Sequence, residues 1–218
     1  MGRGETRVPE GQLREDVAKG VSYDARIGER FLNAGIGFGG SCFPKDTKAL
    51  KFLAEQYGYE LKTVAACVDV NTKQKIRLFE KAKDRMITFS GLKVAVLGLT
   101  FKAGTDDLRE APASENIKLL LEQGADIYAY DPAGVPRAKM QFPEGQIGKG
   151  KITYVESPEV ALEGANICFI FTEWGEIRAV RPVDFKNLMK TPLVYDGRNL
   201  HSIESMKEAG VEYYSIGR

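Results

Sequence analysis

The second half of the chain alternates short apolar strands with amphipathic helices, and no other sequence feature constrains the fold as strongly. Residues 93–98 (KVAVLG) form a β-branched run typical of a strand that is buried on both faces. Residues 114–124 follow with apolar side chains at helical spacing and a closing glycine. Repeated strand–helix–strand units predict an α/β fold with a doubly wound parallel sheet.

The rest of this half continues the alternation to the C-terminus. The further expected strands are residues 126–131, 166–172, 193–196 and 213–216. The further expected helices are residues 157–164, 185–190 and 203–210, the first with Ser157 as its N-cap. Residues 132–150 are rich in glycine and proline, so we expect an exposed loop there.

The first half has the period of helices instead. We expect one helix over residues 45–57, ended by Gly58, and a second over residues 61–86. The outward face of the second helix is basic, and we interpret it as solvated surface: Lys73, Lys75, Arg77, Lys81, Lys83 and Arg85. Gly91 closes this half, so we divide the chain into a helical part, residues 1–91, and a sheet domain, residues 92–218.

Composition excludes several classes of protein. A chain of 218 residues can bury a core without disulfides. With 31 Lys+Arg against 30 Asp+Glu it has no net field for nucleic acid or a membrane surface, and we expect neither as a partner. It has no apolar run long enough to span a membrane and no apolar signal core near its start. Three scattered cysteines make neither a disulfide framework nor a zinc site, so we expect a cytoplasmic protein without a bound metal.

Residues 31–46 (FLNAGIGFGGSCFPKD) carry the clearest chemical signal. Glycines at four of the positions 35–40 let the backbone approach a ligand closely. Cys42 lies where a helix begins, beside Lys45 and Asp46. A thiol in such a place is a candidate nucleophile, although a single cysteine is more often a small buried hydrophobic residue.

Other cysteine and histidine positions predict no chemistry. Cys67 falls in an amphipathic helix and Cys168 in an apolar strand, so we expect both to be buried. His201 has no second titratable residue nearby in the sequence, and we expect a surface position for it.

Polar residues follow the strands at the ends where doubly wound sheets bind ligands. Lys102 and Arg109 come after the first strand, where no GxGxxG dinucleotide motif is found. Asp131 ends the second strand, and its carboxylate can serve a ribose or cap the Asp-Pro turn; both interpretations stay open. Arg198 follows the fourth strand and can bind phosphate or sugar.

The segment FLNAGIGFGGSCFPKDTKAL resembles the catalytic cysteine motif of the UDP-glucose 6-dehydrogenases, in the UDP-glucose/GDP-mannose dehydrogenase family. The second half adds VAVLGLTFKAGTDDLREAP, AYDP, FTEW, YDGRN and VEYYSIGR in the family's order. The resemblance covers residues 13–218 and implies a helical dimerisation segment followed by a Rossmann-like UDP-binding domain. The cysteine motifs of the GDP-mannose and UDP-N-acetylmannosamine dehydrogenases fit less well.

The resemblance implies a role for particular residues. Cys42 matches the nucleophile, Asp46 the carboxylate that positions water, and Lys45 and Arg109 residues that contact NAD. Arg26, in DARIG, resembles an arginine that reaches the UDP-sugar of a neighbouring subunit, so a homodimer is expected. The UDP-sugar site matches Phe31, Leu32, Asn33, Ala34, Gly35, Phe38, Gly39, Phe101, Lys102 and Arg198.

The reaction implied is the oxidation of UDP-glucose to UDP-glucuronate by two NAD, through a thiohemiacetal and a thioester on the cysteine. Family members begin with an NAD-binding domain that carries GxGxxG, so the chain resembles the second half of the enzyme and we expect it to be inactive alone. Two alternatives remain open: a UDP-sugar-binding module without catalysis, and a relative of the GDP-mannose dehydrogenases.

Overall fold

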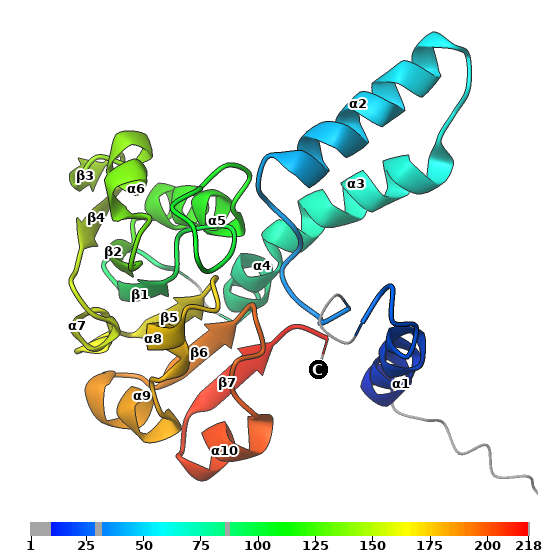
Figure 1. The fold of residues 1–218 in the computed structure, drawn as a ribbon. Coiled ribbons are helices and arrows are strands. Elements are labelled where there is room, and N and C mark those ends of the chain that lie inside the picture. The colour runs from blue at the N-terminus through cyan, green and yellow to red at the C-terminus, as the bar shows by residue number, and fades with distance from the viewer. Residues whose placement is uncertain (1–9, 29–31, 86–87, 218) are drawn as a thin grey trace, which may run out of the picture.

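The computed structural model describes residues 10–28, 32–85 and 88–217. Two parts are visible in Figure 1: a sheet covered by helices, and a helical hairpin that projects from it. Phe31, expected in the UDP-sugar site, lies outside the described residues.

The described residues form a seven-stranded sheet in the order β3-β4-β2-β1-β5-β6-β7. Its strands are β1 (Lys93–Leu97), β2 (Asp126–Tyr130), β3 (Gly145–Ile147), β4 (Gly150–Tyr154), β5 (Ile167–Ile170), β6 (Leu193–Asp196) and β7 (Glu212–Ser215). All neighbouring strands pair in parallel except β3 and β4. The chain runs outward from β1 toward β3 and then from β5 toward β7, which confirms the doubly wound sheet and puts the change of direction between β1 and β5.

Helices cover both faces of this sheet (Figure 1). They are α5 (Pro112–Glu122), α6 (Val135–Gln141), α7 (Pro158–Leu162), α8 (Gly175–Arg178), α9 (Pro182–Leu188) and α10 (Ile203–Glu208). Along β1, Val94 and Val96 face one core cluster with α5, while Ala95 and Leu97 face the other with α7 and α9. The expected N-cap is confirmed, because the Ser157 hydroxyl accepts the Val160 amide at 3.4 Å.

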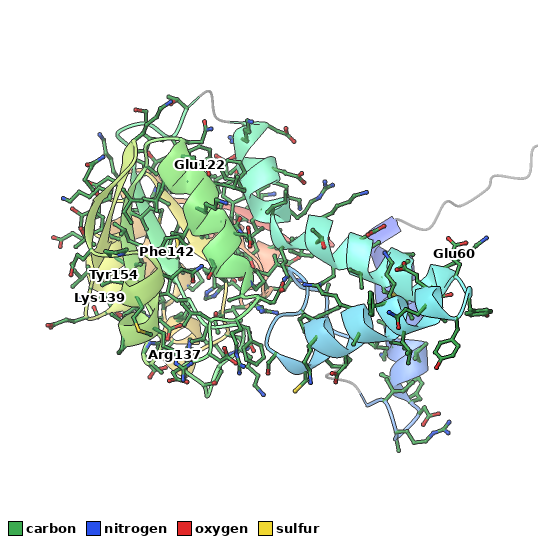
Figure 2. All side chains as sticks on the ribbon, turned by 90° about the horizontal axis from the view of Figure 1, so that it is seen from above. Glu60, Glu122, Arg137, Lys139, Phe142 and Tyr154 are labelled. Atoms are coloured by element: carbon green, nitrogen blue, oxygen red, sulfur yellow. The ribbon has the colours of Figure 1, made fainter. Side chains whose placement is uncertain are left out.

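The prediction of an exposed loop over residues 132–150 is wrong, since this segment forms α6 and begins the β3–β4 hairpin. Pro136 lies in the first turn of α6, where a proline starts a helix and does not break one. Gly148 turns the hairpin with a φ of 58°. The Tyr154 hydroxyl donates to the Phe142 carbonyl at 2.7 Å, and Lys139 lies over the Tyr154 ring, so the hairpin packs beside α6 (Figure 2).

The N-terminal part consists of α1 (Glu10–Ser22), α2 (Cys42–Gln56), α3 (Lys62–Lys75) and α4 (Arg77–Lys83). The single helix expected over residues 61–86 is two helices, with Ile76 between them in a non-helical conformation. Leu78, Phe79 and Ala82 of α4 are buried in the core of the sheet domain. The chain thus bends at Ile76, where α3 leaves the sheet and α4 packs on it (Figure 1).

The α2–α3 hairpin projects from the sheet domain as two antiparallel helices (Figures 1 and 2). Glu60, in the turn between these helices, marks the tip farthest from the sheet (Figure 2). Large apolar side chains on the hairpin are exposed: Phe43, Leu50, Phe52, Leu53, Tyr57, Tyr59 and Val70. No helix among the described residues is long and apolar enough to cross a bilayer.

Candidate active site

The glycine-rich segment before α2 lies across the carboxyl ends of the central strands. The Ile36 amide donates to the Gly197 carbonyl, just after β6, at 3.2 Å, and the Ile36 side chain is buried in the core. The Gly40 amide donates to the Arg109 carbonyl, in the loop after β1, at 2.8 Å. The segment is therefore attached to both sides of the point where the sheet changes direction, which is where such sheets bind ligands.

Gly39 shows why this attachment needs glycine. A Cβ atom at this position would lie 2.5 Å from the Glu110 carbonyl oxygen and 2.9 Å from the Phe101 Cβ. Any larger residue would push the segment off the loop after β1. Gly39 and Gly40 thus lie against Phe101, which brings two of the expected substrate residues, Gly39 and Phe101, together.

Cys42 is the first residue of α2 and its side chain is exposed. Lys45 and Asp46 follow within the first helical turns, and their side chains form an exposed ion pair at 3.2 Å. The spacing i, i+3, i+4 places the thiol, the ammonium group and the carboxylate on one side of the helix. Gly40, Ser41 and Lys45 line one cavity with Arg109, so α2 begins close to the loop after β1.

Arg109 is held in one orientation by Asp107. Its Nε and Nη2 donate to the buried Asp107 carboxylate at 3.0 and 2.7 Å, which raises the pKa of Arg109 and lowers that of Asp107. The Arg109 side chain is nevertheless 65% exposed. It lines a cavity of about 690 Å³ whose charged lining also holds Lys45, Lys48 and Arg137 and the carboxylates Asp107, Glu110 and Glu115. The charges of this cavity are therefore nearly balanced, and Arg109 is its rigidly held cation.

A larger cavity of about 1280 Å³ opens on the other side of the segment. Leu32, Asn33, Ala34 and Gly35 line it beside Arg198 and Asn199, which follow β6. Its other walls come from α1, α3, α4, α8 and the residues after β7. Among the described residues, the cationic side chains that line it are Lys19, Lys73, Arg77, Lys81, Arg178 and Arg198, against one carboxylate, Glu80. Such an excess of cations suits an anionic ligand.

Arg198 is fixed at the rim of this larger cavity. Its Nε and Nη2 donate to the carbonyls of Phe171 and Phe101 at 2.9 and 3.0 Å, and Nε lies 3.2 Å from the Glu173 carboxylate. Only 18% of the side chain is exposed, and this burial lowers its pKa. A Cβ atom on Gly35 would lie 3.5 Å from Nη1, so the guanidinium faces the glycine-rich segment.

Other expected site residues lie apart. The described linings of the two cavities do not include Cys42, Asp46, Lys102 or Arg26. Lys102 is exposed, with its ammonium group 5.5 Å from the centre of the Phe101 ring. Arg26 lies in the turn after α1, where it pairs with Asp24.

Comparison with known proteins identifies this arrangement. Residues 95–203 match the UDP-binding domain of the UDP-glucose/GDP-mannose dehydrogenase family, and residues 13–73 match the central domain of the same family. The chain belongs to this family.

Three relatives show the extent of the match. The chain is 44% identical to UDP-glucose 6-dehydrogenase TuaD of Bacillus subtilis (strain 168), over 93% of this chain and 42% of the relative. It is 42% identical to a UDP-glucose 6-dehydrogenase of Pseudomonas aeruginosa, over 94% of this chain and 45% of the relative. The solved structure of a UDP-glucose dehydrogenase from Pyrobaculum islandicum superposes with a TM-score of 0.76 at 33% identity. The superposition covers 94% of this chain and 45% of that structure's chain. The chain thus spans less than half the length of these family members.

Within this family frame, Asp131 proves to be a turn residue. Its buried carboxylate accepts the amides of Leu99, Thr100, Ala133 and Gly134 and the Trp174 indole N–H. With its oxygens already used in this way, the interpretation as a ribose ligand is wrong and the Asp-Pro turn is confirmed.

Three expectations about single side chains are also wrong. Cys67 is exposed, because no described residue covers that side of the α2–α3 hairpin. His201 is buried and packs edge-on against the Phe185 ring at 5.4 Å. Lys75 is buried although it belongs to the basic face, because it pairs with Glu110. Cys168 is buried as expected, which raises the pKa of its thiol.

Sequence reasoning missed the polar contacts that link α3 to the site. Asn71, Gln74 and Lys75 each bond to one of the two loops that lie around Cys42. Their spacing of i, i+3 and i+4 within a helix was the available signal, since such residues share one face. The partners of that face were not visible, because they lie more than 30 residues away in the chain.

Proposed function

We propose that the chain carries the nucleophilic cysteine and the UDP-sugar site of an NAD-dependent UDP-glucose 6-dehydrogenase, which converts UDP-glucose to UDP-glucuronate. One observation carries the proposal: a glycine-rich segment, attached across the carboxyl ends of the sheet, joins a cation-lined cavity to an exposed thiol at the start of α2. The family, and the relatives that are named UDP-glucose 6-dehydrogenases, support this substrate.

In the proposed UDP-sugar site, the larger cavity takes the nucleotide. Its cations match the charge of a diphosphate, and Arg198 is held rigidly enough to make a directed contact. Leu32, Asn33, Ala34 and Gly35 then contact the ligand as the resemblance implies, while Phe38, Gly39, Phe101 and Lys102 lie on the side nearer Cys42.

In the proposed reaction, C6 of the sugar first loses a hydride and a proton and becomes an aldehyde. The Cys42 sulfur then adds to the aldehyde carbon, and the thiol proton ends on the oxygen, giving a thiohemiacetal. Loss of a second hydride and of the hydroxyl proton leaves a thioester. Water attacks this thioester and the C–S bond breaks, which regenerates the Cys42 thiol and releases the carboxylate and one proton to solvent. Asp46, on the same side of α2 as Cys42, is proposed to position that water.

NAD, when bound, supplies the acceptor for both hydrides. Residues of the smaller cavity fit one anionic edge of such a cofactor, because the Arg109 guanidinium is fixed by Asp107 and still exposed, with Lys45 in the same cavity. Lys45 and Arg109 are therefore proposed to contact NAD, as one wall of its site.

A homodimer in the cytoplasm completes the proposal. Arg26 is exposed after α1 and is free of both described cavity linings, which suits a side chain that reaches a neighbouring subunit. The exposed apolar side chains of the α2–α3 hairpin suit burial against a second copy.

A UDP-sugar-binding module without catalysis is the second candidate. This chain supplies the walls of the larger cavity, which favours binding. Cys42, Lys45 and Asp46, by contrast, lie exposed at the edge of the site, which favours a module without catalysis.

Calorimetry with the purified chain tests the substrate class. We expect UDP-glucose to bind more tightly than GDP-mannose, and Arg77→Gln, which removes a cation from the cavity, to weaken binding about tenfold. Lys62→Gln, which removes a charge at the start of α3 outside the described cavity linings, is the matched control and should bind like the unmodified chain. Absence of UDP-glucose binding, or a preference for GDP-mannose, would refute the proposal.

Iodoacetamide labelling separates the two candidates. Bound UDP-glucose should slow the labelling of Cys42 and leave Cys67 unchanged, if the sugar lies next to the proposed nucleophile. Binding without protection of Cys42 would favour the module that has no catalytic role.

A further inference from the structure

One face of α3 contacts both loops that lie beside Cys42. Asn71, Gln74 and Lys75 are separated by three and four residues, so their side chains point to the same side of the helix. Most of α3 is exposed or half-buried, whereas Asn71 and Lys75 are buried. These two polar residues therefore lie where the projecting hairpin meets the sheet domain.

Asn71 holds the glycine-rich segment by its backbone. Its Oδ1 accepts the Phe38 amide at 2.8 Å, and its Nδ2 donates to the Phe38 carbonyl at 3.1 Å. The side-chain amide thus pairs with both backbone groups of one residue, as a neighbouring strand would. Gly37 has a φ of 84°, and a Cβ atom on it would lie 2.5 Å from Asn71 Oδ1, so this contact requires glycine.

Gln74 holds the same glycine-rich segment at Gly35, three residues before Phe38. Its Nε2 donates to the Gly35 carbonyl at 2.8 Å. Gly35 lines the larger cavity and faces Arg198. Asn71 and Gln74 together therefore set where the wall formed by residues 32–35 lies relative to α3.

Lys75 holds the loop after β1 through Glu110. Its ammonium group is 2.6 Å from one Glu110 oxygen, and Lys48 of α2 is 2.8 Å from the other. Glu110 directly follows Arg109 and has a φ of 55°, a left-handed conformation that residues with a side chain rarely adopt. The two lysines thus bind a strained residue next to Arg109, and they come from both helices of the hairpin.

We propose that Asn71 and Lys75 are positioning residues, which hold the glycine-rich segment and the loop after β1 on either side of Cys42. Gln74 supports the same segment, but it also lines the larger cavity and can touch the ligand directly. The inference rests on the proposed function, because the proposed function assigns the UDP-sugar to the larger cavity, which residues 32–35 line. Asn71 and Lys75 are outside the described linings of both cavities, so they act on the ligand only through Phe38 and Glu110.

Four variants of the full chain test this inference with UDP-glucose as the probe. Asn71→Ser removes both contacts to Phe38, and Lys75→Met removes the contact to Glu110. Lys75→Arg keeps the charge and serves as the rescue. Thr72→Ala is the matched control, since Thr72 lies beside Asn71 on the same helix and its hydroxyl donates to the Val68 carbonyl within α3.

The dissociation constant and the melting temperature are measured for each variant. We expect Asn71→Ser to weaken UDP-glucose binding at least tenfold and Lys75→Met at least threefold, with Lys75→Arg and Thr72→Ala within twofold of the unmodified chain. A purely structural role would lower the melting temperature in parallel with the affinity and would show no rescue by arginine. If Asn71→Ser does not fold, Asn71→Asp, which keeps the acceptor for Phe38 and loses the donor, takes its place.

The outcomes separate this inference from the proposed function. If the unmodified chain binds UDP-glucose and Asn71→Ser binds it equally well, the positioning role is overturned and the proposed function stands. If the unmodified chain does not bind UDP-glucose, the proposed function fails and the inference fails with it.

Discussion

Replacing Glu110 by glutamine should destabilise the chain in a way that depends on pH. Lys48 and Lys75 bond to its carboxylate and lower its pKa from 4.5 to about 2. At roughly 1.4 kcal/mol per pKa unit this corresponds to about 3 kcal/mol. The Glu110 side chain is 41% exposed, so solvent screening reduces the expected contribution to about 1–2 kcal/mol.

The sign follows from the lowered pKa. A carboxyl group whose pKa is lower in the folded state stabilises the fold above its unfolded value of 4.5, and that stabilisation is lost as the pH falls toward about 2. We therefore expect Glu110→Gln to lower the unfolding free energy by about 1–2 kcal/mol at pH 7. The difference from the unmodified chain should shrink steadily below pH 4.5.

Urea unfolding at pH 7, 4 and 3, followed by circular dichroism, measures this difference. Glu55→Gln is the matched control, because Glu55 is an exposed residue of α2 whose partner Lys51 is 3.9 Å away. The control should change the unfolding free energy by less than about 0.5 kcal/mol at each pH. Equal stability of Glu110→Gln and the unmodified chain at pH 7, or a difference that does not vary with pH, would refute the reasoning.

Four further outcomes are expected. The chain alone should not reduce NAD in the presence of UDP-glucose, because its described residues offer a dinucleotide only one wall; steady absorbance growth at about 340 nm would contradict this. Iodoacetamide should label Cys42 and Cys67 in the native chain but Cys168 only after unfolding, because burial raises the pKa of Cys168; native labelling of Cys168, mapped by mass spectrometry, would count against the fold. Gly39→Ala should weaken UDP-glucose binding at least tenfold, because the added Cβ would lie 2.5 Å from a backbone oxygen, whereas Gly20→Ala, with open space around it, should not; equal affinities by calorimetry would refute this. Light scattering at ~0.1 mM should give the mass of a dimer, because the hairpin exposes large apolar side chains, and a clean monomer would contradict it.

Much of the fold could be predicted from local pattern. Residues 94–97 and 193–195 are continuous apolar runs within two of the strands, and a run that is buried on both faces is typical of a central parallel strand. Cys42 could be named because the glycines, the helix start and the charged neighbours that mark it are adjacent in the chain. The family resemblance rests on the same adjacent residues, and the family match confirms it.

The break between α3 and α4 could not be predicted in this way. Residues 61–86 have one helical period throughout, and the bend at Ile76 arises because α4 packs on the sheet while α3 leaves it. The prediction of a loop over residues 132–150 is wrong for a related reason. Proline and glycine are typical of loops, but in the folded chain Pro136 lies in the first turn of a helix and Gly148 in the turn of a hairpin.

The order of strands and helices, and Cys42 as a candidate nucleophile, can be predicted from the chain alone, since both depend on near neighbours in the sequence. Which distant side chains meet depends on the folded structure. Lys75 is buried because Glu110, 35 residues away, supplies the opposite charge, whereas Lys73, two residues earlier on the same basic face, lines a cavity. A charged side chain can be buried only where the fold brings an opposite charge close to it, and a local sequence pattern does not show which distant residues come close.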